Sequence, residues 1–107
     1  MAGVLRERAT VVVIRDGKVL LVKDKGRFRE FKMPGGGIEN GELPIIAAAR
    51  ELHEETNLRA ISIEYLLTLE TAIHKHVLFR VEADGDVEIA PEEIGAFVWW
   101  DQREDLP

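Results

Sequence analysis

The sequence predicts an α/β domain built from β-hairpins and strands around one short helix. Only the segment that starts near Pro44 shows the three-to-four-residue apolar spacing of an amphipathic helix. The other apolar segments are short, and they are separated by Asp-Gly and similar turn residues, as strands are. A chain of 107 residues with 46% hydrophobic residues can bury one core, so we expect a single domain over residues 1–107.

The N-terminal part predicts a β-hairpin. Residues 9–15 and 18–23 are the strand candidates, and Asp16-Gly17 between them is typical of a tight hairpin turn. Residues 11–14 read Val-Val-Val-Ile, and a continuous apolar run of this kind predicts a strand covered on both faces.

The C-terminal half predicts further strands. Residues 58–71 and 74–83 alternate apolar and polar positions, and residues 96–100 form the last strand candidate. Residues 87–92 are predicted as a loop or short strand. His74 and His76 point the same way on their strand, but two histidines without a third ligand are more often surface residues than a metal site.

Residues 35–42 form a glycine-rich loop that leads into the helix. Its glycines permit positive φ and bring bare backbone close to a ligand. Pro44 suits the first helical position, whereas Leu43 has no side-chain group that caps a helix. We therefore expect a weak N-terminus, partly offset by Glu42 near the positive end of the helix dipole.

The helix is predicted to have two different faces. The apolar stripe toward the core comprises Ile45, Ala48, Ala49, Leu52 and Thr56. At about 100° per residue, Glu51, Glu54 and Glu55 fall within roughly a third of the circumference, so we expect them together at the rim, with Arg50 beside them.

Carboxylates crowded in this way repel one another unless a cation binds between them. A Glu-rich helix is ordinarily a solvated face, but the adjoining glycine loop favours a cation site here. Mg²⁺ takes a few carboxylates and completes its shell with water and phosphate oxygens. The loop can add a carbonyl ligand.

Residues 23–32 are the one locally basic stretch, with five basic and two acidic residues. A solvated loop is the simpler interpretation. The alternative is that Arg27, Arg29 or Lys32 contacts a substrate phosphate or base near the metal.

The composition argues against several classes of protein. No run of eighteen apolar residues exists that could span a membrane, and a net charge of −6 argues against broad nucleic-acid binding. Without cysteine there are no disulfides and no thiolate metal sites, which fits a cytoplasmic protein. An acidic protein that handles phosphates needs a cation as mediator.

Residues 36–58 resemble the Nudix box. The spacing is Gly36, five residues, Glu42, seven residues, Arg50-Glu51-Leu52, one residue, Glu54-Glu55, one residue, Asn57 and Leu58. Eight of the nine specified positions match. The exception is Asn57, where the family has glycine just past the helix; asparagine is the next-best residue for a left-handed helix end, so we expect the geometry to be kept.

The resemblance implies the Nudix fold of MutT-like hydrolases, a mixed β-sheet in an α/β/α sandwich. The family's closing helix, which follows the last strand, has no counterpart in residues 101–107. Either the chain is truncated at its C-terminus, or a partner subunit covers the open face. Because an uncovered apolar sheet favours association, we expect a homodimer or a larger assembly.

The resemblance also implies Mg²⁺-dependent hydrolysis, with Mn²⁺ as the alternative ion, of a nucleoside diphosphate linked to another moiety X. Glu54 and Glu55 would be the main metal ligands, and Glu51 a ligand or the general base. Further metal ligands and supporting or substrate-binding roles are implied for Gly35 (carbonyl), Glu93 (alternatively Glu92), Arg50, Glu39, Glu42, Gly36 and Gly37.

The substrate is predicted to be a nucleotide or nucleotide-sugar-type small molecule. A nucleoside triphosphate, normal or oxidised, is favoured because two markers of other subfamilies are missing: no proline lies between Pro44 and Pro91, and Tyr65 is too close to the box. A binding or regulatory module without turnover is the alternative function. The absence of cysteine argues against an isomerase on the same scaffold.

Overall fold

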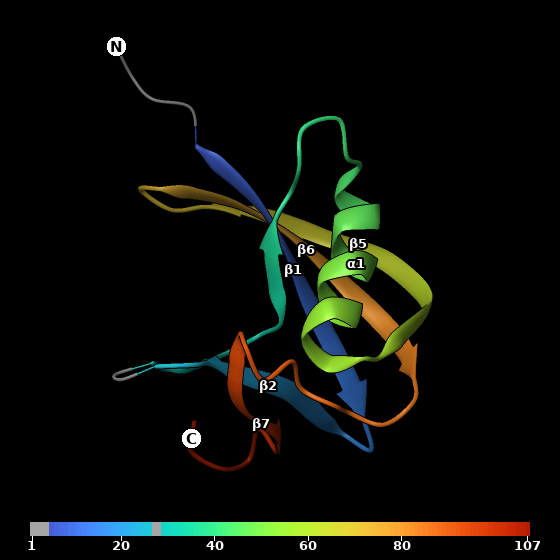
Figure 1. Ribbon diagram of the computed structural model, residues 1–107, viewed down its shortest axis with the longest axis vertical. Coiled ribbons are helices and arrows are strands. Elements are labelled where there is room, and N and C mark those ends of the chain that lie inside the picture. The colour runs from blue at the N-terminus through green and yellow to red at the C-terminus, as the bar shows by residue number, and fades with distance from the viewer. Residues whose placement is uncertain (1–4, 27–28) are drawn as a thin grey trace.

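The computed structural model describes residues 5–26 and 29–107, in which one helix packs on a seven-stranded mixed sheet (Figure 1). The elements are β1 (Arg6–Arg15), β2 (Lys18–Asp24), β3 (Phe31–Lys32), β4 (Gly35–Gly37), α1 (Pro44–Thr56), β5 (Arg59–Glu70), β6 (His74–Asp84) and β7 (Ile94–Trp100). The strand order is β3-β2-β1-β6-β5, with β4 beside β1 and β7 beside β2. Strands β1 and β6 run parallel and the other pairs antiparallel, so the predicted mixed sheet is confirmed.

The predicted N-terminal hairpin is confirmed. Asp16 and Gly17 both have positive φ, 53° and 74°, as a two-residue type I′ turn requires. Strand β1 begins at Arg6, earlier than predicted, because Arg6 to Arg8 pair with His74 to His76 of β6. That pairing depends on residues almost seventy positions away and has no local signal.

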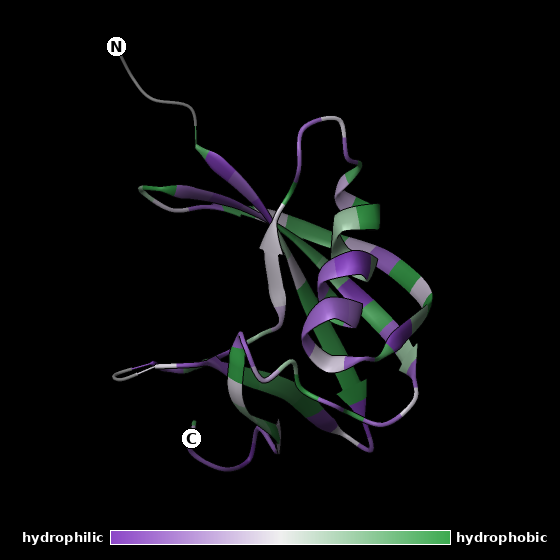
Figure 2. Ribbon diagram, in the orientation of Figure 1, coloured by the Kyte–Doolittle hydropathy of each residue, from purple (hydrophilic) through white to green (hydrophobic). Residues whose placement is uncertain are grey.

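The prediction that this strand is covered on both faces is wrong. Val11 and Val13 are buried under α1, whereas Val12 is half-buried and Ile14 is 42% exposed on the opposite face. Figure 2 shows hydrophobic residues along the strands behind α1. In the described part of the chain a helix covers only one face of the sheet, and association through the other face stays a prediction.

The ends of α1 match the expected caps. Leu43 makes no side-chain capping bond, and Asn57 adopts the left-handed conformation with φ 65°. The expected offset from Glu42 is not seen at the helix end, because its carboxylate binds Arg50 instead. Among the described residues no helix has the length and apolarity needed to cross a membrane.

The predicted apolar stripe of α1 is partly wrong. Ala48, Leu52 and Thr56 are buried as expected, but Ile45 is 40% exposed and Ala47 is fully buried in its place. The buried face of the helix is thus rotated toward the acids, and this rotation carries Glu51 and Glu55 inward against β4.

Candidate active site

Strand β4 presents one backbone edge to β1 and the other to α1. Val11 donates its N–H to the Pro34 carbonyl (2.9 Å), and Ile38 donates to the Glu7 carbonyl (3.0 Å). In an antiparallel pair, every second residue directs its N–H and C=O at the partner strand. Gly36 lies between these two bonds and directs its N–H and C=O at β1, so Gly35 and Gly37 direct theirs away from β1. Gly35 accordingly donates its N–H to Glu55 Oε1 (3.0 Å). Its carbonyl lies on that same edge, where it was predicted as a metal ligand.

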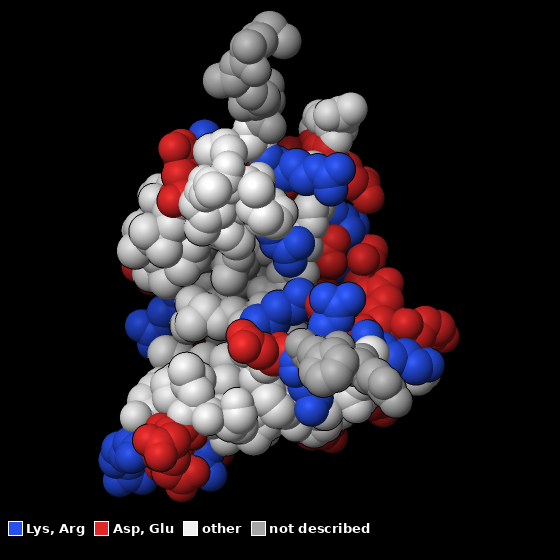
Figure 3. Space-filling model, turned by 90° about the vertical axis from the view of Figure 1, so that its left-hand side faces the viewer, with Lys and Arg blue, Asp and Glu red and all other residues white. Residues whose placement is uncertain are grey.

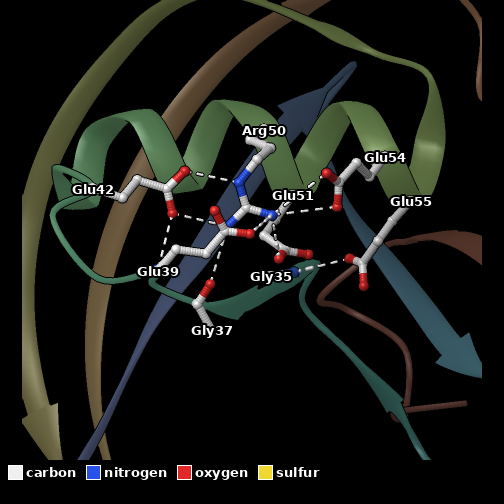
Figure 4. Close-up of polar contacts among 8 residues, drawn as sticks. All are labelled: Gly35, Gly37, Glu39, Glu42, Arg50, Glu51, Glu54 and Glu55. Atoms are coloured by element: carbon white, nitrogen blue, oxygen red, sulfur yellow. Dashed lines mark hydrogen bonds and ion pairs between the residues drawn. The ribbon is translucent and has the colours of Figure 1, made fainter.

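Arg50 organises the carboxylates of α1 and the preceding loop (Figure 4). Its Nε and Nη2 donate to the two oxygens of Glu42 at 2.7 and 2.9 Å, a bidentate pair. Its Nη1 donates to Glu51 (2.8 Å) and more loosely to Glu54 (3.3 Å), and Nη2 also reaches the Gly37 carbonyl (3.1 Å). Bonding to Arg50 lowers the pKa of Glu42 to about 2. The guanidinium therefore holds these groups as predicted by resemblance.

Glu51 and Glu55 are the two inward carboxylates. Burial raises the pKa of Glu55 to about 7, and the Gly35 N–H and Lys32 only partly oppose this effect. Burial also raises the pKa of Glu51, against the hydrogen bond from Arg50. Glu55 is 5% exposed, so its predicted position at the solvent rim is wrong. It lies between helix and sheet because the helix face is rotated.

The other predicted acids lie nearer to solvent. The side chains of Glu54 and Glu39 are 48% and 72% exposed, and Glu39 reaches Arg50 only at 3.9 Å. Glu93, on the loop before β7, is exposed, and its charge contributes to the raised pKa of Glu51 after burial and the charge of Glu54. The charge of Glu93 thus acts on Glu51, and the predicted role of Glu93, or of Glu92, as a metal ligand stays a prediction.

Gly36 leaves room for a carboxylate of the site, and its predicted contact with substrate stays a prediction. A Cβ built on Gly36 would overlap the carboxylate of Glu51, whereas a Cβ on Gly37 would meet nothing within 4 Å. A Cβ on Gly35 would collide with the Ala9 carbonyl. Gly36 thus makes room for Glu51, and Gly35 permits close contact with β1.

The chemistry of this donor set fits a hard divalent cation. Carboxylates and a backbone carbonyl are the ligands that Mg²⁺ prefers. Within residues 5–26 and 29–107, no three His, Asp or Glu side chains yet converge on one point, because Arg50 lies between Glu51 and Glu54. The Arg50–Glu54 contact is long for a charge-assisted bond, so Glu54 is the carboxylate most easily turned toward an ion.

The structure describes only part of the basic stretch, residues 23–32. Arg27 lies outside the described residues, and Arg29 is exposed. Lys32 is on β3, where its Nζ forms an ion pair with Asp24 Oδ2 at 2.7 Å. Its positive charge is one of the smaller effects on Glu55, whose pKa it lowers against the effect of burial.

A cavity lies on the opposite face of the sheet from α1. Its volume is about 410 Å³, and it is lined by Arg8, Thr10, Lys32, Met33, His74 and His76. The sequence analysis missed Arg8, Thr10 and Met33. Ala9 and Val11 of β1 are buried, so the alternation along the strand predicts that Arg8 and Thr10 lie on the opposite face. The pairing of β1 with β6, which brings His74 and His76 to the same cavity, has no signal in the sequence.

Sequence comparisons identify relatives of this chain. The family profile described as the NUDIX domain matches residues 5–106. A MutT-like protein of Streptomyces ambofaciens is 33% identical over 100 residues, covering 85% of this chain and 60% of that protein. An RNA pyrophosphohydrolase of Mesorhizobium japonicum is 50% identical over 38 residues, 36% of this chain and 22% of its own length. The chain thus spans 60% or less of the length of these relatives.

Solved structures share the fold. A MutT NUDIX hydrolase from Burkholderia pseudomallei has a TM-score of 0.87 at 23% identity, covering 98% of this chain and 88% of its own. A nudix hydrolase family member from Chromobacterium violaceum has a TM-score of 0.80 at 30% identity, covering 92% and 64%. A UDP-X diphosphatase has a TM-score of 0.82 at 20% identity, covering 99% and 55%.

Proposed function

The chain belongs to the Nudix family, and on that premise we propose that it is an Mg²⁺-dependent hydrolase that cleaves the phosphoanhydride bond of a nucleoside diphosphate linked to X. A nucleoside triphosphate, normal or oxidised, is the favoured substrate. The observation that carries the proposal is the arrangement around Arg50, which gathers the box carboxylates against the backbone edge of β4. The relatives' names, RNA pyrophosphohydrolase and UDP-X diphosphatase, agree with diphosphate chemistry.

The residues that would hold the ion are Glu51, Glu54, Glu55, the Gly35 carbonyl and Glu93. When bound, Mg²⁺ would screen the phosphate charge and lower the pKa of an attacking water. Glu55 and Glu51 are held inward by Gly35 and Arg50, so they need little rearrangement to serve as ligands. A cation beside these carboxylates also relieves the cost of charging them in a buried position.

The general base is a carboxylate of this same group. Glu51 suits proton acceptance because burial raises its pKa above that of an ordinary glutamate while Arg50 keeps it oriented. We propose that Lys32, whose charge lowers the pKa of Glu55, binds a phosphate oxygen, and that Arg29 and Arg27 are further residues for the same task.

Glu54→Gln tests the proposal. Phosphate release from a nucleotide panel with Mg²⁺ is expected to fall by about 100-fold or more, since a lost metal ligand removes several kcal/mol of transition-state stabilisation. Because Glu54 is half exposed, folding should be unaffected. Glu64→Gln, an exposed glutamate on β5, is the matched control and should retain activity. Activity that survives Glu54→Gln contradicts the metal site, and nucleotide binding without turnover in the wild type would indicate a regulatory module.

A further inference from the structure

Among the described residues, strands β3, β4, β5 and β7 each pair with one neighbour, so each has a free backbone edge. Figure 3 shows that charged side chains gather along one side of the face in view, while uncharged residues cover much of the rest. Soluble proteins usually protect a free edge by keeping the strand short, by bulges, by charged side chains or by proline. A free edge without such protection is a surface on which another strand can pair.

Three of these edges are protected. Strand β3 has only two residues and is followed closely by Pro34. The free edge of β4 is occupied by a hydrogen bond to α1. Strand β5 has twelve residues, but its pairing with β6 shifts register at two places, and it carries the charged residues Arg59, Glu64 and Glu70. These edges are poorly suited to pairing with another chain.

The edge of β7 lacks this protection over most of its length. Its pairing with β2 is regular from Ala96 to Trp100, with one register shift at Gly95. Residues 96–100 read Ala-Phe-Val-Trp-Trp, with no charge and no proline. Each of these residues is half-buried or exposed, and Phe97 is 40% exposed. Within residues 5–26 and 29–107, no hydrogen bond beyond the pairing with β2 involves the backbone of this segment, so its outer edge is free.

The regular segment of β7 is complementary to a second copy of itself. In an antiparallel pair about a two-fold axis at Val98, Val98 faces its own copy. Phe97 then faces Trp99, and Ala96 faces Trp100. Opposed positions differ by an even number of residues, so both members of each pair lie on the same face of the sheet. No opposed pair carries charge, and aromatic and β-branched pairs of this kind stabilise neighbouring strands.

We propose that β7 pairs with the β7 strand of a second copy of this chain, so that one continuous sheet crosses a two-fold axis at Val98. An uncharged, apolar edge fits an uncharged, apolar strand, and β7 itself is such a strand. The paired edge of residues 96–100 is about 17 Å long, so the interface is small and we expect dissociation in the micromolar range. The dimer expected from the sequence used the open face of the sheet, which is a different surface.

Analytical ultracentrifugation across the micromolar range tests the dimer, and the wild-type protein should show a monomer–dimer equilibrium. Val98→Lys places two ammonium groups opposite each other at the axis, and Val98→Glu places two carboxylates there, so each should weaken the dimer at least about tenfold. An equimolar mixture of the two variants should restore a dimer with one copy of each, because lysine then faces glutamate. Leu67→Lys is the matched control, because Leu67 is 43% exposed on the edge strand β5, and it should leave the dimer unchanged.

Disulfide cross-linking decides the question if circular dichroism shows that a charged variant is unfolded. The chain has no cysteine, so Val98→Cys introduces a single thiol, which faces its own copy at the axis. Oxidation of Val98→Cys should give a covalent dimer at least about tenfold faster than oxidation of the control Leu67→Cys.

Several outcomes would overturn the inference. These are a wild-type protein that stays monomeric, a dimer that survives Val98→Lys, a mixture of folded variants that stays monomeric, and equal cross-linking rates at Val98 and Leu67. Loss of the dimer in Leu67→Lys would assign the interface to β5 instead. None of these measurements depends on hydrolysis, so the proposed function is tested separately.

Discussion

The two sides of β4 differ in how their charges are satisfied. On the α1 side, Arg50 and the Gly35 N–H hold Glu42, Glu51 and Glu55 in fixed positions. On the opposite side, basic residues from β1, β3 and β6 surround an open cavity, and Asp24 is the one acid that pairs with them among the described residues.

The comparison shows two ways in which charged side chains are held beside one strand. The acidic side is preorganised by its own hydrogen bonds and needs only an ion. On the basic side Lys32 is paired with Asp24, and the other wall residues are positioned by the strand register. Because Gly35 and Gly36 have no side chain, both Glu51 of α1 and the backbone of β1 can lie close to the backbone of β4.

The largest expected effect is a difference in hydrolysis rate between alanine variants of the adjacent residues Gly36 and Gly37. Gly36→Ala would place a methyl group on the Glu51 carboxylate, so hydrolysis should fall by roughly 100-fold, as displacement of a catalytic group by about 1 Å does. Gly37→Ala meets open space at an ordinary φ and should change kcat less than about twofold. Steady-state kinetics of the two variants measures this. Equal losses would show that the whole strand, rather than room for Glu51, is what the site needs.

The next effect concerns the buried carboxylate Glu55. Its folded pKa of about 7 exceeds its usual 4.5, so its contribution to stability is present below about pH 4.5 and is lost as the pH rises through 7. Without divalent cations, the free energy of unfolding should fall by up to about 3 kcal/mol between pH 5 and 8.

Glu55→Gln should remove most of that fall, because glutamine carries no charge and still accepts the Gly35 N–H. Glu54→Gln, at a half-exposed position, is the control and should keep it. Denaturant unfolding at the two pH values measures the difference. A Glu55→Gln variant with the wild-type pH dependence would show that Glu55 is ionised at little cost.

The smallest expected effect concerns the ion pair between Lys32 and Asp24. Lys32 and Asp24 are 41% and 35% exposed, so their ion pair contributes at most about 1 kcal/mol. Asp24→Asn frees Lys32 for substrate phosphate and should lower KM by about two- to fivefold with kcat unchanged. Measured KM values at low and high salt check this. A raised KM would instead assign Asp24 to substrate or metal binding.

The site was predictable where its residues are close in sequence. Arg50, Glu51, Glu54 and the glycine loop lie within one loop-helix segment, so their spacing specifies their relative positions. The inward position of Glu55 was not predictable, because it depends on how α1 rotates against the sheet. The cavity wall was also missed, since Arg8 and His76 meet only through parallel pairing of strands far apart in the chain.

The sequence by itself determined the hairpin turn at Asp16-Gly17, the helix Pro44–Thr56 with its left-handed end at Asn57, and the closeness of Arg50 to Glu54, because each depends on local backbone preference or helical spacing. Only the tertiary structure decided which carboxylates are buried and which basic residues line the cavity opposite α1. Burial and strand register are set by packing between distant segments, and no local pattern specifies that packing.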